Sequence, residues 1–282
     1  MSTRSAIPYI TLNDGTTLPA VGFGTYTLNG TKGVNDMVRA VRNGYRLFDS
    51  AFNYENEGAV GRAIAQCGVA REELRVISKL PGRHHAYDEA ITTVEESLYR
   101  TGLDYFDLYL IHWPNPIQNH YVEAWQAMIE VQKRGLVRSI GVCNFLPEHL
   151  RRLIDETDVT PSINQVELHP YFPQDEQRAW DSKHGIVTQS WSPLGRASAV
   201  LNDPLLKGIS ERLGKSIPQI ILRWHVQLGA IPIPKASSNE RQIENLSLFD
   251  FMLSDDDMAQ IATLARPDGR IMDMDPARHE EF

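Results

Sequence analysis

The sequence has few cysteines and no long apolar segment. Only two of its 282 residues are cysteine, Cys67 and Cys143, which is too few for a disulfide framework and indicates a reducing compartment. No apolar run approaches the roughly 20 residues that a membrane-spanning helix needs. The first residues, Met1 to Pro8, lack the apolar region of a signal peptide. We therefore expect a soluble cytoplasmic protein without a membrane partner.

The sequence also lacks an excess of positive charge. It has 28 Lys and Arg against 36 Asp and Glu, a net charge of -8 with histidine neutral. A nucleic-acid surface needs a basic face, so nucleic acid is not expected as a partner. Hydrophobic residues make up 42% of the chain, as in ordinary globular proteins. No linker rich in Pro, Gly or Ser divides the chain, so we expect a single domain over residues 1–282.

Short apolar runs alternate with amphipathic segments along the chain. Residues 9–18 are typical of a hairpin with an Asn13-Asp14-Gly15 turn. The strands expected after it are 21–24, 47–48, 75–78, 106–111, 137–142, 163–166, 186–189 and 230–233. The expected helices are 34–43, 57–66, 87–99, 121–133, 147–155, 175–183, 203–213, 217–227 and 239–246. Eight strands, each followed by a helix, predict an α/β fold, a closed (β/α)8 TIM barrel.

A run of three aspartates follows Ser254 near the end of the chain. Such a run has two interpretations, a metal site or the first turn of a helix. Serine is a favoured N-cap, and the helix dipole stabilises acidic residues in the first turn. We interpret Ser254 and Asp255 to Asp257 as a helix start and expect no metal site.

Polar residues mark the carboxyl ends of the expected strands, where barrel enzymes have their active sites. In chain order they are Asp49, Lys79, His112, Asn144, Gln165, Trp191 and Lys235. Singly, each has a structural interpretation: Lys79 as an ion-pair partner of Asp49, and His112 as a hydrogen-bonded core histidine. Three of them, Asp49, Lys79 and His112, join Tyr54, which shortly follows Asp49, to put four titratable groups of different kinds on one face. That convergence favours a functional site.

The chemistry of these four groups suits the protonation of an oxygen. A tyrosine has an ordinary pKa near 10, and a nearby ammonium lowers that pKa by stabilising the phenolate. A carboxylate keeps a buried ammonium charged and in place. Tyr54, Lys79 and Asp49 supply these three parts, and His112 can orient a carbonyl oxygen. The set suits the protonation of an oxygen as negative charge develops on it, as in carbonyl reduction.

These side chains cannot deliver a hydride, so the reaction requires a cofactor. The sequence has no Walker A motif, and Gly22-Phe23-Gly24 has Thr27 where a Rossmann motif has its third glycine. A nicotinamide would therefore bind in another way, by stacking on Trp191 with its carboxamide on Asn144 and Gln165. Lys235 and Arg241 are candidates for a phosphate site at a helix N-terminus, and a solvated basic turn is the alternative.

Three motifs resemble signatures of the aldo-keto reductase family. The first is Gly44-Tyr45-Arg46-Leu47-Phe48-Asp49-Ser50-Ala51 with Glu57 and Gly61. The second is Ile140-Gly141-Val142-Cys143-Asn144-Phe145, and the third is Ile233-Pro234-Lys235 with Arg241, Glu244, Asn245 and Leu248. The resemblance covers essentially the whole chain. It implies a barrel whose bottom is capped by the N-terminal hairpin and which binds NADPH across the strand ends.

The resemblance also assigns residues. The catalytic tetrad falls on Asp49, Tyr54, Lys79 and His112. The resemblance implies Tyr54 as the proton donor, Lys79 and Asp49 as the pair that tunes it, and His112 as the group that orients the carbonyl. The implied cofactor contacts are Thr25, Asp49, Asn144, Gln165, Trp191, Ser192, Pro193, Leu194, Lys235, Ser237, Ser238, Arg241, Glu244 and Asn245. The chain departs from the family at Ala236, where a serine or threonine is usual. Ser237 or Ser238 can substitute for that hydroxyl, so NADPH is expected and NADH remains a second possibility.

The substrate pocket is expected to be apolar and aromatic. Its expected walls are Tyr26, Phe52, Tyr54, His112, Trp113 and the tail 268–282. The short tail is similar to bacterial members of the 2,5-diketo-D-gluconate reductase type. Such members act on small aldehydes, dicarbonyls such as methylglyoxal, and keto-sugars. We expect a small carbonyl substrate and a monomeric protein.

Two other functions are alternatives to carbonyl reduction. A barrel glycoside hydrolase would use two carboxylates, here Asp49 and Glu167. That interpretation leaves Tyr54, Lys79 and Lys235 without a function. The second alternative is an NADPH-binding sensor or regulatory module with little turnover, which the complete tetrad disfavours.

Overall fold

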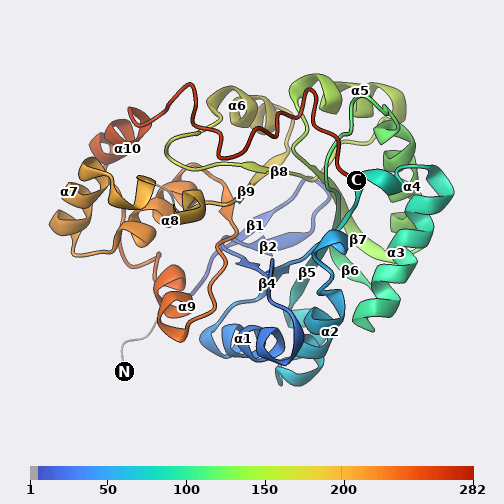
Figure 1. Ribbon diagram of the computed structural model, residues 1–282, viewed down its shortest axis with the longest axis horizontal. Helices are drawn as coiled ribbons and strands as arrows, with labels where there is room; N and C mark the ends of the chain where they lie inside the picture. Colours follow the sequence, from blue (N-terminus) through green and yellow to red (C-terminus); the bar gives the residue numbers. More distant parts are fainter. Residues whose placement is uncertain (1–5, 198) are drawn as a thin grey trace.

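The computed structural model describes residues 6–197 and 199–282, and in it eight parallel strands form a barrel with helices outside (Figure 1). The expectation about a signal peptide rests partly on residues 1–5, which lie outside the described residues. The barrel strands are β3 (Phe23–Gly24), β4 (Leu47–Asp49), β5 (Arg75–Leu80), β6 (Phe106–Ile111), β7 (Val137–Cys143), β8 (Ile163–Glu167), β9 (Val187–Trp191) and β10 (Ile231–Pro232). They follow one another around the sheet in chain order, which confirms the predicted (β/α)8 fold.

The barrel closes where its first strand meets its last. The Gly22 N–H donates to the Pro232 carbonyl at 3.0 Å, and the Gly24 N–H donates to the Pro234 carbonyl at 3.1 Å. Proline has no N–H, so neither Pro232 nor Pro234 can donate a bond in return. Ile233, between them, donates instead to Ser190 of β9 at 3.0 Å. The last strand is thus held on both sides despite its two prolines.

Ten α-helices lie among the described residues. They are α1 (Gly30–Asn43), α2 (Glu57–Gln66), α3 (Tyr87–Thr101), α4 (Tyr121–Lys133), α5 (Pro147–Thr157), α6 (Asp175–Lys183), α7 (Pro204–Leu213), α8 (Ile217–Gln227), α9 (Asn239–Leu246) and α10 (Asp255–Ala262). The predicted bounds of α2, α4, α6, α8 and α9 are confirmed. The Ser254 side chain accepts from the Asp257 N–H, which confirms the predicted cap of α10. None of the described helices is long and apolar enough to cross a membrane.

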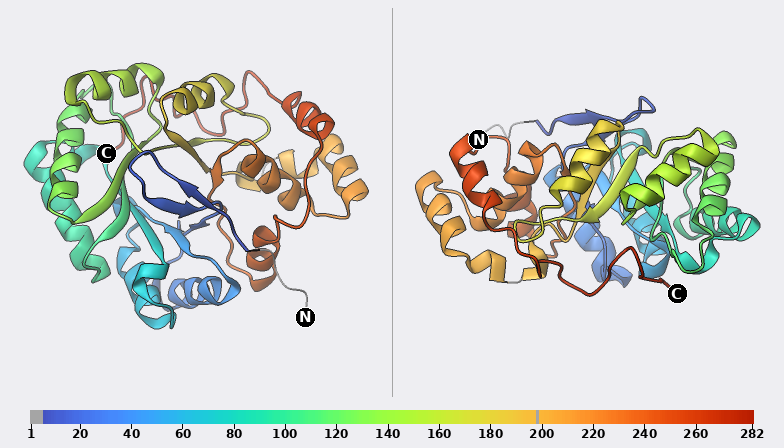
Figure 2. Two further views of the ribbon diagram at one scale, coloured as in Figure 1. Left: turned by 180° about the vertical axis from the view of Figure 1, so that it is seen from behind. Right: turned by 90° about the horizontal axis from the view of Figure 1, so that it is seen from above.

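The N-terminal hairpin covers the barrel end at which the strands begin. Its strands are β1 (Tyr9–Thr11) and β2 (Thr17–Pro19), and Leu12 and Leu18 pack into the apolar cluster inside the barrel. The Arg75 guanidinium, at the start of β5, donates to the Thr17 carbonyl at 3.0 Å. Figure 2 shows the hairpin and the C-terminal tail on opposite sides of the barrel. The predicted cap at the barrel bottom is confirmed.

Alternation along the strands decides which side chains face the barrel interior. Leu47, Ile77, Leu108 and Ile163 belong to one interior cluster. Because side chains alternate with a period of two, the next inward positions toward the carboxyl ends include Asp49, Lys79, Gln165 and, two positions beyond Leu110, His112. The apolar interior therefore gives way to polar groups at the end where the tail crosses the barrel (Figure 1).

Candidate active site

A buried ion pair lies at the ends of β4 and β5. The Lys79 ammonium lies 2.7 Å from Asp49 Oδ1, and it also donates to the Ser50 carbonyl at 2.6 Å. The second Asp49 oxygen accepts from Gln165 Nε2 at 2.8 Å. Burial alone would lower the pKa of Lys79, but the neighbouring Asp49 raises it above its ordinary value. Lys79 is thus a permanent buried cation.

Tyr54 lies above this ion pair on the 3-10 helix η1 (Phe52–Tyr54), which directly follows β4. The Lys79 ammonium is 5.0 Å from the centroid of the Tyr54 ring, and the His112 ring centroid is 5.9 Å from it. The structure brings together all four residues of the predicted tetrad. Burial raises the pKa of the Tyr54 hydroxyl to about 12, although Lys79 acts to lower it. The expected net lowering is wrong for the protein alone, because desolvation exceeds the effect of Lys79.

His112 contacts a carboxylate that the sequence analysis did not single out. Its Nδ1 lies 2.7 Å from Oε1 of Glu281, the penultimate residue of the chain. Glu281 also accepts from Asn53 Nδ2 at 2.8 Å and from the Gly82 N–H at 3.0 Å. Burial would raise the pKa of Glu281, but His112 and these two donors together lower it to about 2. The predicted tail segment therefore reaches the site through an ionised carboxylate.

The predicted nicotinamide residues form a connected group beside the tetrad. Trp191 Nε1 donates to Asn144 Oδ1 at 2.8 Å, and Asn144 Nδ2 donates to the His112 carbonyl at 3.1 Å. Gln165 Nε2 donates to Gln189 Oε1 at 2.5 Å as well as to Asp49. Gln189 was not predicted, and its Nε2 is buried with no hydrogen-bond partner among the described residues. The sequence could have indicated Gln189 by its place on β9, at a position that faces the barrel interior.

The residues after β3 and β9 that were predicted to contact the cofactor also form contacts within the protein. The Thr25 hydroxyl donates to the Asp49 carbonyl at 2.8 Å. Ser192 has a left-handed backbone with a φ of 48°, and the buried Pro193 carbonyl lies 3.2 Å from His225 Nε2. Leu194 packs against the apolar clusters outside the barrel. These contacts fix the course of the chain where it leaves β9.

The predicted phosphate site lies where α9 begins. Lys235 and Arg241 are exposed, and neither forms an ion pair within the part of the chain that the structure describes. Ser238 caps α9 through its side chain, while the Ser237 carbonyl accepts from Arg39 of α1 at 2.7 Å. Glu244 is half-buried and Asn245 is buried on the same helix. Two unpaired cations at a helix N-terminus suit a phosphate.

The residues predicted to line the substrate pocket differ in their exposure and in what they contact. Tyr26 is 54% exposed, and its ring packs edge-on against Tyr54 at 5.0 Å. The Trp113 ring lies 4.3 Å from the ring of His279 in the tail. Phe52 is buried, with the Arg100 guanidinium 3.8 Å from its ring centroid. Phe52 also lines a cavity of about 460 Å³ with Arg83 and Arg100.

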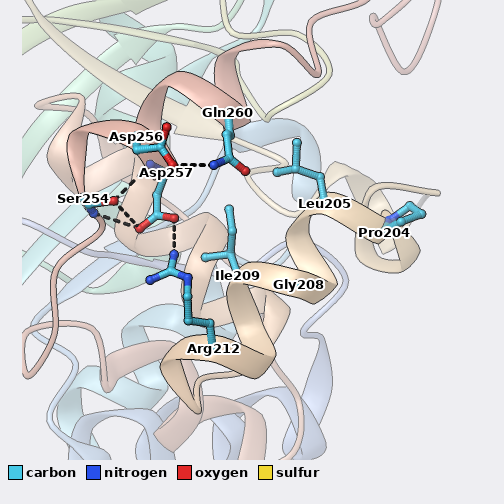
Figure 3. A pocket seen from close by; sticks show the side chains of 9 residues that line it. All are labelled: Pro204, Leu205, Gly208, Ile209, Arg212, Ser254, Asp256, Asp257 and Gln260. Atoms are coloured by element: carbon cyan, nitrogen blue, oxygen red, sulfur yellow. Dashed lines mark hydrogen bonds and ion pairs between the residues drawn. The ribbon is translucent and has the colours of Figure 1, made fainter.

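Another cavity lies far from the strand ends. It has a volume of about 500 Å³ and lies between α7 and α10, with Leu205 and Ile209 among its lining residues (Figure 3). Arg212 and Asp257 form an ion pair beside it. Asp257 is also engaged with the capping residue Ser254 (Figure 3). Arg212 and Asp257 thus serve an ion pair and a helix cap. They do not form a converging set of titratable groups like the tetrad.

The family model described as the aldo/keto reductase family matches residues 20–266. The chain belongs to the aldo/keto reductase family. The protein is therefore an oxidoreductase, and the predicted resemblance is confirmed. This membership removes the glycoside hydrolase alternative based on Asp49 and Glu167. In the structure, the Glu167 carboxylate lies 3.0 Å from His169 Nε2 and accepts from the Ile271 N–H of the tail at 2.7 Å.

Relatives of the same family extend over nearly the full chain. The 2,5-diketo-D-gluconic acid reductase B of a Corynebacterium species is 52% identical over 98% of this chain and 99% of its own. The methylglyoxal reductase DkgA of Escherichia coli is 43% identical over 95% of this chain and 96% of its own. A solved structure of a Gox0644 mutant in complex with NADPH matches with a TM-score of 0.92. It is 41% identical and covers 96% of this chain and 98% of its own.

Proposed function

We propose that this protein reduces aldehydes and ketones to alcohols with NADPH, and that Tyr54 donates the proton. The observation that supports this most directly is the buried Lys79–Asp49 ion pair beneath the Tyr54 ring. A neutral phenol next to a fixed cation can release its proton at the moment an oxygen acquires negative charge. A permanent ammonium then stabilises the phenolate that remains.

The residues around the site fit NADPH. Gln189 Nε2 is a buried donor without a partner among the described residues, and Gln189 lies in register with Gln165, the predicted carboxamide residue. Lys235 and Arg241 are exposed cations at the N-terminus of α9, which suits a 2'-phosphate. NADPH supplies the hydride when it is bound. Relatives crystallised with NADPH or NADP support the same cofactor.

The chain's own groups perform the remaining tasks. Asp49 keeps Lys79 in place, and Lys79 stabilises negative charge on the Tyr54 oxygen. His112 lies next to Tyr54 and orients the carbonyl oxygen toward the phenol. The Tyr26 ring packs edge-on against the Tyr54 ring at 5.0 Å and shields one side of it.

We propose a small dicarbonyl, aldehyde or keto-sugar as the substrate. The names of two relatives, a methylglyoxal reductase and a 2,5-diketo-D-gluconic acid reductase, support this class. The test is to follow the loss of NADPH absorbance with methylglyoxal and with 2,5-diketo-D-gluconate, and to identify the product. We expect one alcohol formed per NADPH consumed. No NADPH loss with any small carbonyl, while NADPH still binds, would contradict the proposal and support a sensor.

A further inference from the structure

The carboxylate of Glu281 is held by groups from three separate loops. His112 Nδ1 follows β6, Asn53 lies on η1, and the Gly82 N–H lies after β5, at distances of 2.7, 2.8 and 3.0 Å from the carboxylate. The backbone of Glu281 is fixed too: its N–H donates to Asn115 Oδ1 at 3.0 Å, and its carbonyl accepts from Asn115 Nδ2 at 2.9 Å. These contacts leave one position for the carboxylate.

The rest of the tail is anchored on both sides of the site. Near its start, the Arg266 N–H donates to the Tyr171 carbonyl at 3.0 Å, and the Ile271 N–H donates to Glu167 at 2.7 Å. Near its end, Glu280 accepts from the Ile117 N–H at 2.7 Å. The tail therefore crosses the strand ends as a fixed strap (Figure 1) that delivers Glu281 to His112.

The chemistry of a carboxylate determines where the proton of His112 resides. An ionised carboxylate only accepts hydrogen bonds, and its other two neighbours here are an amide NH2 and a backbone N–H, both donors. A hydrogen on His112 Nδ1 is therefore favoured by the carboxylate 2.7 Å away, and a small rotation of the ring aligns this N–H, which has no aligned acceptor among the described residues, with Glu281. A neutral imidazole has only one N–H, so Nε2 is left as the nitrogen that meets a substrate oxygen. In the imidazolium form the same Nε2 carries an N–H that can donate to a carbonyl.

We propose that Glu281 is a positioning residue, which fixes the proton of His112 on Nδ1 and holds the ring with Nε2 toward the substrate. The contact also places a negative charge beside the imidazolium, the form that donates to a carbonyl oxygen. The proton that ends on the alcohol still comes from Tyr54, so Glu281 and His112 bind and orient the oxygen. This inference rests on the proposed carbonyl reduction.

The first test is a spectroscopic one on the cofactor-free protein. Nitrogen NMR of histidine-labelled protein distinguishes protonated from unprotonated ring nitrogens, and His112→Gln identifies the His112 signals. We expect the neutral ring to carry its hydrogen on Nδ1 in the wild type. Glu281→Ala is expected to move the hydrogen to Nε2 or to give a mixture, while Glu281→Gln retains part of the preference. His112 signals that are the same in Glu281→Ala and wild type would overturn the proposal.

The second test measures reduction of methylglyoxal by the same variants. We expect Glu281→Ala to lower kcat/KM for the carbonyl roughly 10- to 100-fold, the usual effect of removing a group that orients a histidine, with NADPH affinity unchanged. Glu73→Ala removes an equivalent charge from an exposed position just before β5, away from the carboxyl ends of the strands, and should leave kcat/KM unchanged. A change of tautomer without a loss in kcat/KM would also overturn the proposal.

The two tests separate this inference from the proposed function. If the wild-type protein reduces no carbonyl, the proposed function fails, and the NMR signals still report whether Glu281 fixes the proton of His112. Melting temperatures of all variants are measured beside kcat/KM, because Glu281 also contacts Asn53, Gly82 and Asn115. A loss of kcat/KM that follows a fall in melting temperature, with His112 signals unchanged, would assign Glu281 a structural function only.

Discussion

Lys79 is completely buried, and Asp49 is the carboxylate that balances its charge. Removing one member of a buried ion pair leaves the other charge without compensation, which costs about 3–5 kcal/mol. We predict a loss of this order in the free energy of unfolding for Lys79→Met, measured by urea denaturation. The double variant Asp49→Asn, Lys79→Met removes both charges and should recover most of the loss. Equal stability of the single and double variants would refute this account of the pair.

Arg241 is predicted to distinguish NADPH from NADH. A charge-assisted hydrogen bond contributes about 1.5–3 kcal/mol, or roughly 10- to 100-fold in affinity. Arg241→Ala should raise the Kd for NADPH by this factor and change the Kd for NADH little, as measured by fluorescence titration. Arg151→Ala, an exposed arginine of α5, is the matched control. Equal losses for both cofactors would exclude a contact between Arg241 and the 2'-phosphate. The loop that carries Ala236 would then not discriminate between NADPH and NADH.

The packing of α2 against α3 depends on one glycine. A Cβ at Gly61 would lie 1.8 Å from the Thr101 carbonyl oxygen, whereas a Cβ at Gly58 of the same helix would lie 3.5 Å from its nearest neighbour. We predict that Gly61→Ala lowers the free energy of unfolding by about 1–3 kcal/mol, because the helices must separate. Gly58→Ala should be neutral or stabilising by up to about 1 kcal/mol. Urea denaturation of both variants measures these changes in the free energy of unfolding. Equal effects of the two substitutions would contradict the close contact at Gly61.

Asp181 makes the attachment of α6 sensitive to pH. Burial raises the pKa of this carboxyl from 3.8 to about 7, against hydrogen bonds from Gln177, Asn164 and Thr188 that lower it. Below pH 3.8 both states are protonated. Between pH 4 and 7 the unfolded state releases the proton first, so the free energy of unfolding falls as pH rises, by an amount on the order of a few kcal/mol.

Asp181→Asn removes this dependence while keeping the shape of the side chain. We predict that the variant becomes more stable than the wild type as pH rises through this window, and that the difference is constant above about pH 7. Urea unfolding at several pH values measures it. Glu176→Gln, at an exposed position of the same helix, is the control. A difference that does not change with pH would show that Asp181 is ionised throughout.

The elements themselves were largely predictable from the sequence. The ends of the expected strands placed Asp49 and Lys79 on one face of the barrel, and Asn13-Asp14-Gly15 located the hairpin turn. The start of α1 was missed: the helix begins at Gly30, four residues before the expected Val34. Its first turn, Gly30 to Gly33, has no apolar residue that would signal a buried face. Gly33 is nevertheless packed against the Leu28 backbone, a contact that only the folded chain reveals.

At the scale of the whole molecule, contacts between distant segments determined what the sequence could not predict. Gly82 and Glu281 are 199 residues apart, and no motif or periodicity connects them. The direction of the Tyr54 pKa was missed for a similar reason, because the degree of burial depends on the assembled barrel. The prediction of one domain stays a prediction, supported by an apolar cluster that joins Phe23 and Val41 to Leu222 and Leu248.

The central claim is that Tyr54 donates the proton, and Tyr54→Phe tests it most directly. The variant removes one hydroxyl and leaves the ring, so NADPH affinity, measured by fluorescence, should stay within about twofold of the wild type. General acid catalysis contributes about 10²- to 10⁴-fold, and the rate of NADPH consumption with methylglyoxal should fall by that factor. A variant that binds NADPH and reduces methylglyoxal at the wild-type rate would contradict the account.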